Sequence, residues 1–128
     1  MAGDFTDLTV YKKAKAFRKR IWLLVHKLPK NQEFVLVSQM RRASLSVTNN
    51  IAEGHGCGTY THNISYLRRS RGSMNELVDD ISVCEDESFF KKDHLDVLMN
   101  DASEVLRLIN GYIRFLKKRK RLGKTDSD

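Results

Sequence analysis

The sequence predicts an all-α protein, folded as one antiparallel, up-down-up-down four-helix bundle. The 128 residues include only one proline and seven glycines, too few for a protein built from many strands and tight turns. Hydrophobic residues make up 41% and charged residues 30% of the chain, as in folded globular domains. Four segments also carry apolar residues at alternating steps of three and four, which aligns each set along one face of a helix.

The first two helices are predicted at about 9–28 and 33–53. In the first segment the apolar stripe comprises Ala14, Phe17, Ile21, Leu24 and Leu28. Asp7 or Thr9 is a suitable N-cap, and Pro29 ends the segment because proline cannot continue a helix. In the second segment the stripe comprises Val37, Met40, Ser44, Val47 and Ile51. Gly54 is the predicted stop of this helix.

The last two helices are predicted at about 59–87 and 92–120, with Thr59 and Asp93 as N-caps. The third stripe comprises Leu67, Ser70, Met74, Leu77, Ile81, Cys84 and Ser88. The fourth comprises Leu95, Leu98, Ala102, Val105, Ile109, Tyr112 and Leu116. Three glycines allow the positive φ angles that a sharp turn between the second and third helices needs: Gly54, Gly56 and Gly58. We expect a single domain over 1–121 and a disordered tail over 122–128.

The charge is distributed unevenly along the chain. The net charge is +7, but residues 1–72 hold 13 Lys/Arg against 4 Asp/Glu, and residues 73–116 hold 4 against 10. Residues 117–128 are basic again, with 6 against 2. A basic front and tail around an acidic middle favour a polyanionic partner. We therefore predict binding of RNA or DNA through the sugar–phosphate backbone, with weak sequence preference.

Candidate nucleic-acid-binding residues form four clusters at helical spacing. They are Lys12, Lys15 and Lys19 in the first helix, Arg41 and Arg42 in the second, Arg68, Arg69 and Arg71 in the third, and Lys117, Lys118, Arg119, Lys120 and Arg121 in the fourth. Each cluster alone is typical of a solvated face. Tyr60 and Tyr66 flank the third cluster, where they could stack on unpaired bases or serve in packing.

A polar stripe in the second helix also points towards binding, because a bundle selected only for stability would carry leucine there. Its members follow one another at steps of three and four: Arg42, Ser46, Asn49 or Asn50, and Glu53. Surplus apolar residues in the first helix, namely Tyr11, Trp22 and Leu23, together with Phe89 and Phe90, favour a homo-oligomer.

We expect no enzymatic activity, no cofactor and no metal. The chain lacks a Gly-x-Ser-x-Gly elbow and a His-Glu-x-x-His motif. His55, Cys57 and His62 lack a fourth ligand at a recognised spacing. Cys57 and Cys84 make no disulfide framework, and the longest apolar run, Ile21–Val25, is far too short to span a membrane. These features, with a start that lacks the pattern of a secretory signal, predict a cytoplasmic protein.

Several motifs resemble one bacterial four-helix-bundle family. They are Leu28-Pro29, Ser38-Gln39-Met40-Arg41-Arg42-Ala43, Asn50-Ile51-Ala52-Glu53-Gly54, Tyr66-Leu67, Gly72-Ser73 and Ile109-Asn110-Gly111-Tyr112. The family includes proteins encoded by intervening sequences of 23S rRNA genes and accessory variability determinants of diversity-generating retroelements. The resemblance implies a homopentameric barrel with basic surfaces and no enzymatic activity.

The two branches of this family imply different partners. In the retroelement branch, the barrel binds RNA or DNA and a reverse transcriptase, and supports cDNA synthesis and mutagenic retrohoming. Arg69-Ser70, where relatives have an Ile-Ala pair, and the basic tail favour this branch. The alternatives are an intervening-sequence-encoded protein that binds rRNA and an oligomeric scaffold that docks an acidic protein.

Overall fold

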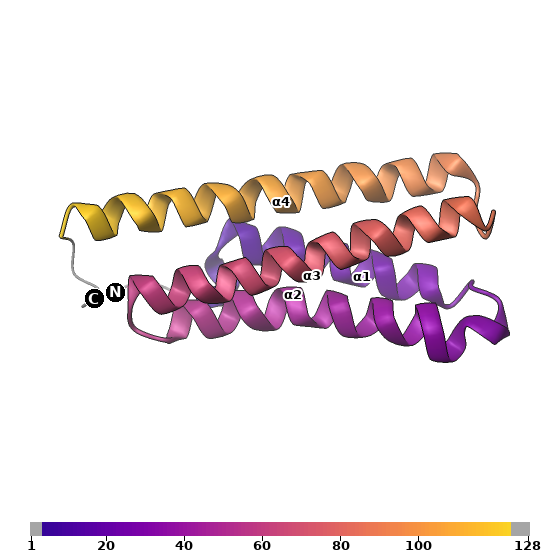
Figure 1. The fold of residues 1–128 in the computed structure, drawn as a ribbon, viewed down its shortest axis with the longest axis horizontal. Coiled ribbons are helices and arrows are strands. Elements are labelled where there is room, and N and C mark those ends of the chain that lie inside the picture. Colours follow the sequence, from indigo (N-terminus) through magenta and orange to yellow (C-terminus); the bar gives the residue numbers. More distant parts are fainter. Residues whose placement is uncertain (1–3, 124–128) are drawn as a thin grey trace.

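Four long antiparallel α-helices account for most of residues 4–123, the part of the chain that this computed structural model describes (Figure 1). Their bounds are α1 Thr9–Val25, α2 Ser38–Gly56, α3 Tyr60–Asp86 and α4 Lys92–Arg121. A 3₁₀ turn, η1 (Phe5–Asp7), precedes α1. The predicted all-α bundle is therefore confirmed. Of the predicted tail at 122–128, residues 124–128 lie outside the described part of the chain.

Each helix packs beside its sequence neighbours, and α1 closes the bundle against α4. The resulting order is up-down-up-down, with α1 diagonal to α3 and α2 diagonal to α4. The α2–α3 turn and the end of α4 lie at one end of the bundle, on the left of Figure 1. The α1–α2 connection and the α3–α4 turn lie at the other end. Whether copies assemble into a pentamer stays a prediction.

The connection between α1 and α2 differs from the prediction. Helix α1 ends at Val25 rather than near residue 28, and the 3₁₀ turn η2 (Lys30–Gln32) follows Pro29. A π-helical turn, η3 (Glu33–Val37), then leads directly into α2. The second helix therefore begins where it was predicted, but its first turn is wider than that of a regular α-helix.

The predicted stop at Gly54 is wrong, because α2 continues to Gly56. Gly54 is instead a point of close approach: a Cβ atom there would lie 2.6 Å from Asn63 Oδ1 and 3.0 Å from Tyr66 Cβ of α3. Of the three glycines in this region only Gly58 has positive φ, at 90°. The left-handed turn that glycine permits is therefore made at Gly58, the last of the three glycines predicted to allow it.

The N-caps are only partly as predicted. Thr59 caps α3, because its side chain accepts a hydrogen bond from the His62 amide at 3.2 Å. The N-cap of α1 is Leu8 and that of α4 is Lys91, and neither side chain caps its helix. Asp93 lies inside the first turn of α4, where a carboxylate still interacts favourably with the helix dipole.

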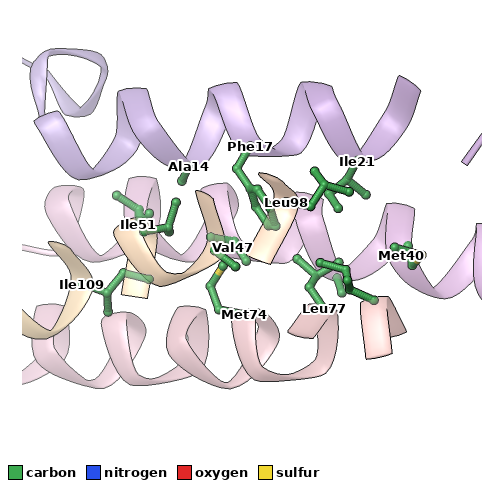
Figure 2. Packing of buried hydrophobic residues seen from close by; sticks show 14 of the residues in the cluster. Ala14, Phe17, Ile21, Met40, Val47, Ile51, Met74, Leu77, Leu98 and Ile109 are labelled. Carbon is green, nitrogen blue, oxygen red and sulfur yellow. The ribbon is translucent and has the colours of Figure 1, made fainter. Parts of the chain in front are cut away.

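The four apolar stripes converge on one continuous core (Figure 2). Phe17 and Ile21 point from α1 towards Val47 of α2, and Met74 and Leu77 reach the same centre from α3. The predicted stripes are buried throughout, except for the half-buried Leu24 and Tyr112 and the exposed Ser88. Cys84 is fully buried as predicted, and burial raises the pKa of its thiol to about 11. That thiol is therefore protonated at neutral pH.

Candidate nucleic-acid interface

A basic groove lies where the first turns of α3 pass beside the last turns of α4. It encloses about 320 Å³ and is lined by Thr61, Ile64, Arg68, Lys117, Lys120 and Arg121. Because the two helices are antiparallel, residues 49 or more positions apart in the chain meet here. Lys120 and Arg121 follow Lys117 by three and four residues. All three therefore lie on one face of α4, the face turned towards α3. The structure thus joins the predicted third and fourth clusters.

Most of the charge in this groove is not neutralised by the protein. Within residues 4–123, none of Arg68, Lys117 and Arg121 forms an ion pair. The nearest helix end on the α4 side is a C-terminus, whose partial negative charge stabilises cations there. The N-terminus of α3 contributes partial positive charge from its first amides. The groove is therefore suited to an anion that approaches from solvent.

Other members of the two clusters are held by side chains of the opposite helix. Arg119 Nε donates to Tyr60 Oη at 3.0 Å, and its guanidinium lies 5.5 Å from the Phe115 ring centroid. Lys120 Nζ donates to Thr61 Oγ1 at 2.5 Å. The two hydrogen bonds connect the end of α4 to the start of α3. They fix the geometry of the groove that Lys117 and Arg121 line.

The aromatic residues near the groove have different roles. Tyr60 is only 5% exposed, so its ring packs in the core and cannot stack on a base. Tyr66 is half-buried, and the Arg69 guanidinium lies 4.9 Å from its ring centroid. Arg71 Nη1 donates to Asn110 Oδ1 at 2.9 Å, which ties α3 to the middle of α4. Arg69 and Lys118 are exposed beside the groove rather than in it.

The predicted residues of α1 and α2 lie on other surfaces. Arg41 is half-buried with its guanidinium 5.4 Å from the Trp22 ring centroid, and Arg42 pairs with Glu76 at 3.1 Å. The three predicted lysines of α1, which is diagonal to α3, are all exposed: Lys12, Lys15 and Lys19. The predicted set therefore does not form one surface. Only the third and fourth clusters come together.

Two members of the polar stripe of α2, Arg42 and Ser46, contact α3 along the seam between the two helices. Ser46 accepts a hydrogen bond from Ser73 at 2.9 Å, and the Val47 carbonyl accepts one from Ser70 at 2.9 Å. Further along the same seam, Arg42 pairs with Glu76. Polar groups that are satisfied across a helix–helix contact serve packing rather than ligand binding. Ser46 and Arg42 therefore serve packing, whereas the binding role predicted for the rest of the stripe stays a prediction, because Asn49 and Glu53 are exposed.

One residue of this seam carries a charge that the sequence analysis missed. Asp80 is 2% exposed; its Oδ1 accepts from Gln39 Nε2 at 2.7 Å, and its Oδ2 has no hydrogen-bond partner. Burial, followed by the nearby Asp79 and Glu76, raises the pKa of this carboxyl to about 6. The available signal was its spacing, since Asp80 follows the buried Leu77 by three residues.

Among the described residues, no group of three or more His, Cys, Asp and Glu side chains is placed to hold a metal ion. None of the helices within residues 4–123 combines the length and apolar character needed to cross a bilayer.

Comparisons with known proteins agree with this fold. A solved structure from Bacteroides thetaiotaomicron, described as a protein of unknown function from the S23 ribosomal protein family, superposes with a TM-score of 0.76. It shares 24% sequence identity and covers 82% of this chain and 95% of its own. No curated protein sequence matches. Residues 6–111 match the 23S rRNA-intervening sequence protein family. The chain therefore belongs to the 23S rRNA-intervening sequence protein family.

Proposed function

We propose that this protein is a non-enzymatic RNA-binding protein that works as a homo-oligomer and grips RNA in the α3–α4 groove. One observation carries the proposal: cations from two helices converge in a groove and, for Arg68, Lys117 and Arg121, have no acidic partner within residues 4–123. Like charges brought together without neutralisation are disfavoured unless an anion joins them. A sugar–phosphate strand supplies such anions at regular spacing, and each phosphate contact releases a condensed counterion.

Membership of the family supports ribosomal RNA as the target, since the family is named after intervening sequences of 23S rRNA. The alternative is the retroelement role, in which the protein also binds a reverse transcriptase. The exposed Arg69 beside the groove is the feature that favours it. Gene context separates the two: an rRNA gene around the reading frame supports the first, and a reverse transcriptase gene with template and variable repeats supports the second. An acidic protein in place of RNA is the third possibility.

We expect the combined variant Arg68→Ala/Lys117→Ala/Arg121→Ala to bind RNA at least about tenfold more weakly than the wild type at moderate salt. The slope of log affinity against log salt should flatten by roughly two to three, because each lost phosphate contact removes about one released counterion. Fluorescence anisotropy with labelled single-stranded RNA, duplex RNA and single-stranded DNA between about 50 and 200 mM salt measures both quantities.

A matched control removes the same charge from the opposite end of the bundle. Lys27, Lys30 and Lys91 are exposed, and the Lys27→Ala/Lys30→Ala/Lys91→Ala variant should keep most of the affinity. Equal losses in both variants would mean that RNA responds to net charge alone, which contradicts a defined groove. A wild type that binds no polynucleotide at 50 mM salt, but binds an acidic protein, contradicts the RNA proposal itself.

A further inference from the structure

We propose that the apolar groove on the α1–α2 face is the docking site for a second copy of this chain, which inserts the acidic second half of its α3 and the turn that follows. This inference rests on the homo-oligomer of the proposed function and names the two faces that meet. The interface is heterologous, because one face of each copy meets a different face of the next.

The docking groove encloses about 530 Å³ and is lined by Arg18, Lys19, Trp22, Leu23, His26 and Leu45. Three large apolar side chains are left open to solvent in it: Trp22 is 39%, Leu23 67% and Leu45 41% exposed. Exposed apolar residues that adjoin one another and are bordered by polar groups are typical of protein-binding surfaces.

The side chains of this groove are held in place before any partner arrives. Trp22 Nε1 donates to Ser44 Oγ at 2.9 Å, and Arg41 covers the indole ring. Arg18 Nη1 donates to Thr48 Oγ1 at 2.7 Å, which anchors the basic border to α2. A surface whose rotamers are already ordered loses less conformational entropy when it binds.

The border of the groove belongs to a helix in which every charged residue is basic. From Thr9 to Val25, α1 carries six Lys/Arg and no Asp/Glu. The opposite holds for residues 72–90, which carry six Asp/Glu and no Lys/Arg. Within residues 4–123, Arg20–Asp101 is the only ion pair of the first segment and Arg42–Glu76 the only one of the second. Each segment therefore keeps most of its charge available.

The bundle prevents these two segments from neutralising each other inside one copy. Helix α1 packs against α2 and α4, while α3 lies diagonally across the core, so the outer faces of α1 and α3 point in opposite directions. Opposite charges on opposite faces attract between copies instead. A repeated contact of this kind closes into a ring when the rotation allows it.

The acidic segment also supplies apolar side chains for the groove. Glu85, Asp86 and Glu87 are exposed, and the half-buried Phe89 and Phe90 follow them in the α3–α4 turn. Carboxylates can meet Arg18 and Lys19 while the exposed parts of Phe89 and Phe90 reach Trp22. A symmetric contact of groove with groove is disfavoured, since it would oppose two helices with six cations each. The aliphatic Leu23 and Leu45 favour a protein partner over a nucleobase.

Two variants, each with two substitutions at exposed positions, test this arrangement. Lys19→Glu/Leu23→Asp damages the groove, and Glu85→Lys/Glu87→Lys damages the acidic face. Light scattering after size exclusion should find the wild type oligomeric and each variant alone monomeric. Circular dichroism should find both variants folded, because none of the four side chains is buried. An equimolar mixture should form a 1:1 dimer and nothing larger, because it contains one intact groove and one intact acidic face.

The alternative outcomes each contradict a different statement. If the wild type is monomeric, both the proposed homo-oligomer and this interface are wrong. If the wild type is oligomeric and both variants keep its mass, the homo-oligomer stands and this interface is wrong. If only the groove variant dissociates, and the acidic-face variant keeps the wild-type mass both alone and in the mixture, the contact is groove to groove. If the groove variant keeps its mass but loses RNA affinity, the groove binds nucleic acid instead.

Discussion

At pH 7.5 we expect the Asp80→Asn variant to be more stable than the wild type by about 1–3 kcal/mol. Asp80 is buried in the α2–α3 seam with one carboxylate oxygen unpartnered. Its pKa rises from 3.8 to about 6 on folding. That difference corresponds to at most about 3 kcal/mol when the group is charged. Asparagine has nearly the same shape, can still accept the hydrogen bond from Gln39 and carries no charge.

The pH dependence follows from the sign of this shift. Because the folded protein holds the proton of Asp80 more tightly than the unfolded chain, the contribution of Asp80 to stability is complete below about pH 3.8 and is lost as pH rises through about 6. The advantage of Asp80→Asn should therefore grow between about pH 4 and pH 6.5 and then level off. Urea unfolding followed by circular dichroism at several pH values measures it.

Asp79→Asn is the matched control, because Asp79 is the exposed neighbour of Asp80 in α3. Removing its charge should lower the pKa of Asp80 slightly and change the stability far less than Asp80→Asn does. If Asp80→Asn is less stable than the wild type at pH 7.5, the charged carboxylate has an interaction that outweighs its burial, and our account of this site is wrong.

Replacing Gly54 by alanine should destabilise the bundle by about 1–3 kcal/mol, although alanine is the better helix former. The added Cβ would lie 2.6 Å from Asn63 Oδ1, 3.0 Å from Tyr66 Cβ and 3.2 Å from the Asn63 carbonyl oxygen. The Asn63 side chain could rotate away. The Asn63 backbone carbonyl and the Tyr66 Cβ atom cannot move without separating α2 from α3. The cost of that strain exceeds the gain in helix propensity.

Gly72→Ala isolates the propensity effect. Gly72 lies within α3, and a Cβ atom there would meet nothing within 4 Å. The Gly72→Ala variant should therefore gain about 0.5–1 kcal/mol, opposite in sign to Gly54→Ala. Denaturant midpoints of the two variants and the wild type decide the matter. A Gly54→Ala variant as stable as Gly72→Ala would mean that the two helices adjust freely at this point.

Much of the secondary structure was predictable because helical periodicity depends only on residues that are close together in the sequence. The stripes through Phe17, Met40, Met74 and Leu98 are buried as predicted, and Thr59 caps its helix. Helix ends were less predictable. Gly54 is a typical stop residue in the sequence, yet it lies inside α2, because its missing side chain makes room for α3. The residues around Gly54 in the sequence do not indicate that α3 packs so closely against it.

The candidate site divides in the same way. The sequence by itself determined that the protein would be helical, that its core would follow four stripes, and that its cations would be concentrated in the front and the tail. Only the tertiary structure decided which cations meet: Arg68 joins Lys117 and Arg121, while Arg42 pairs with Glu76. It also decided that Asp80 is buried. The physical reason is that spacing along a helix defines a face, whereas the partner of that face comes from a distant part of the chain.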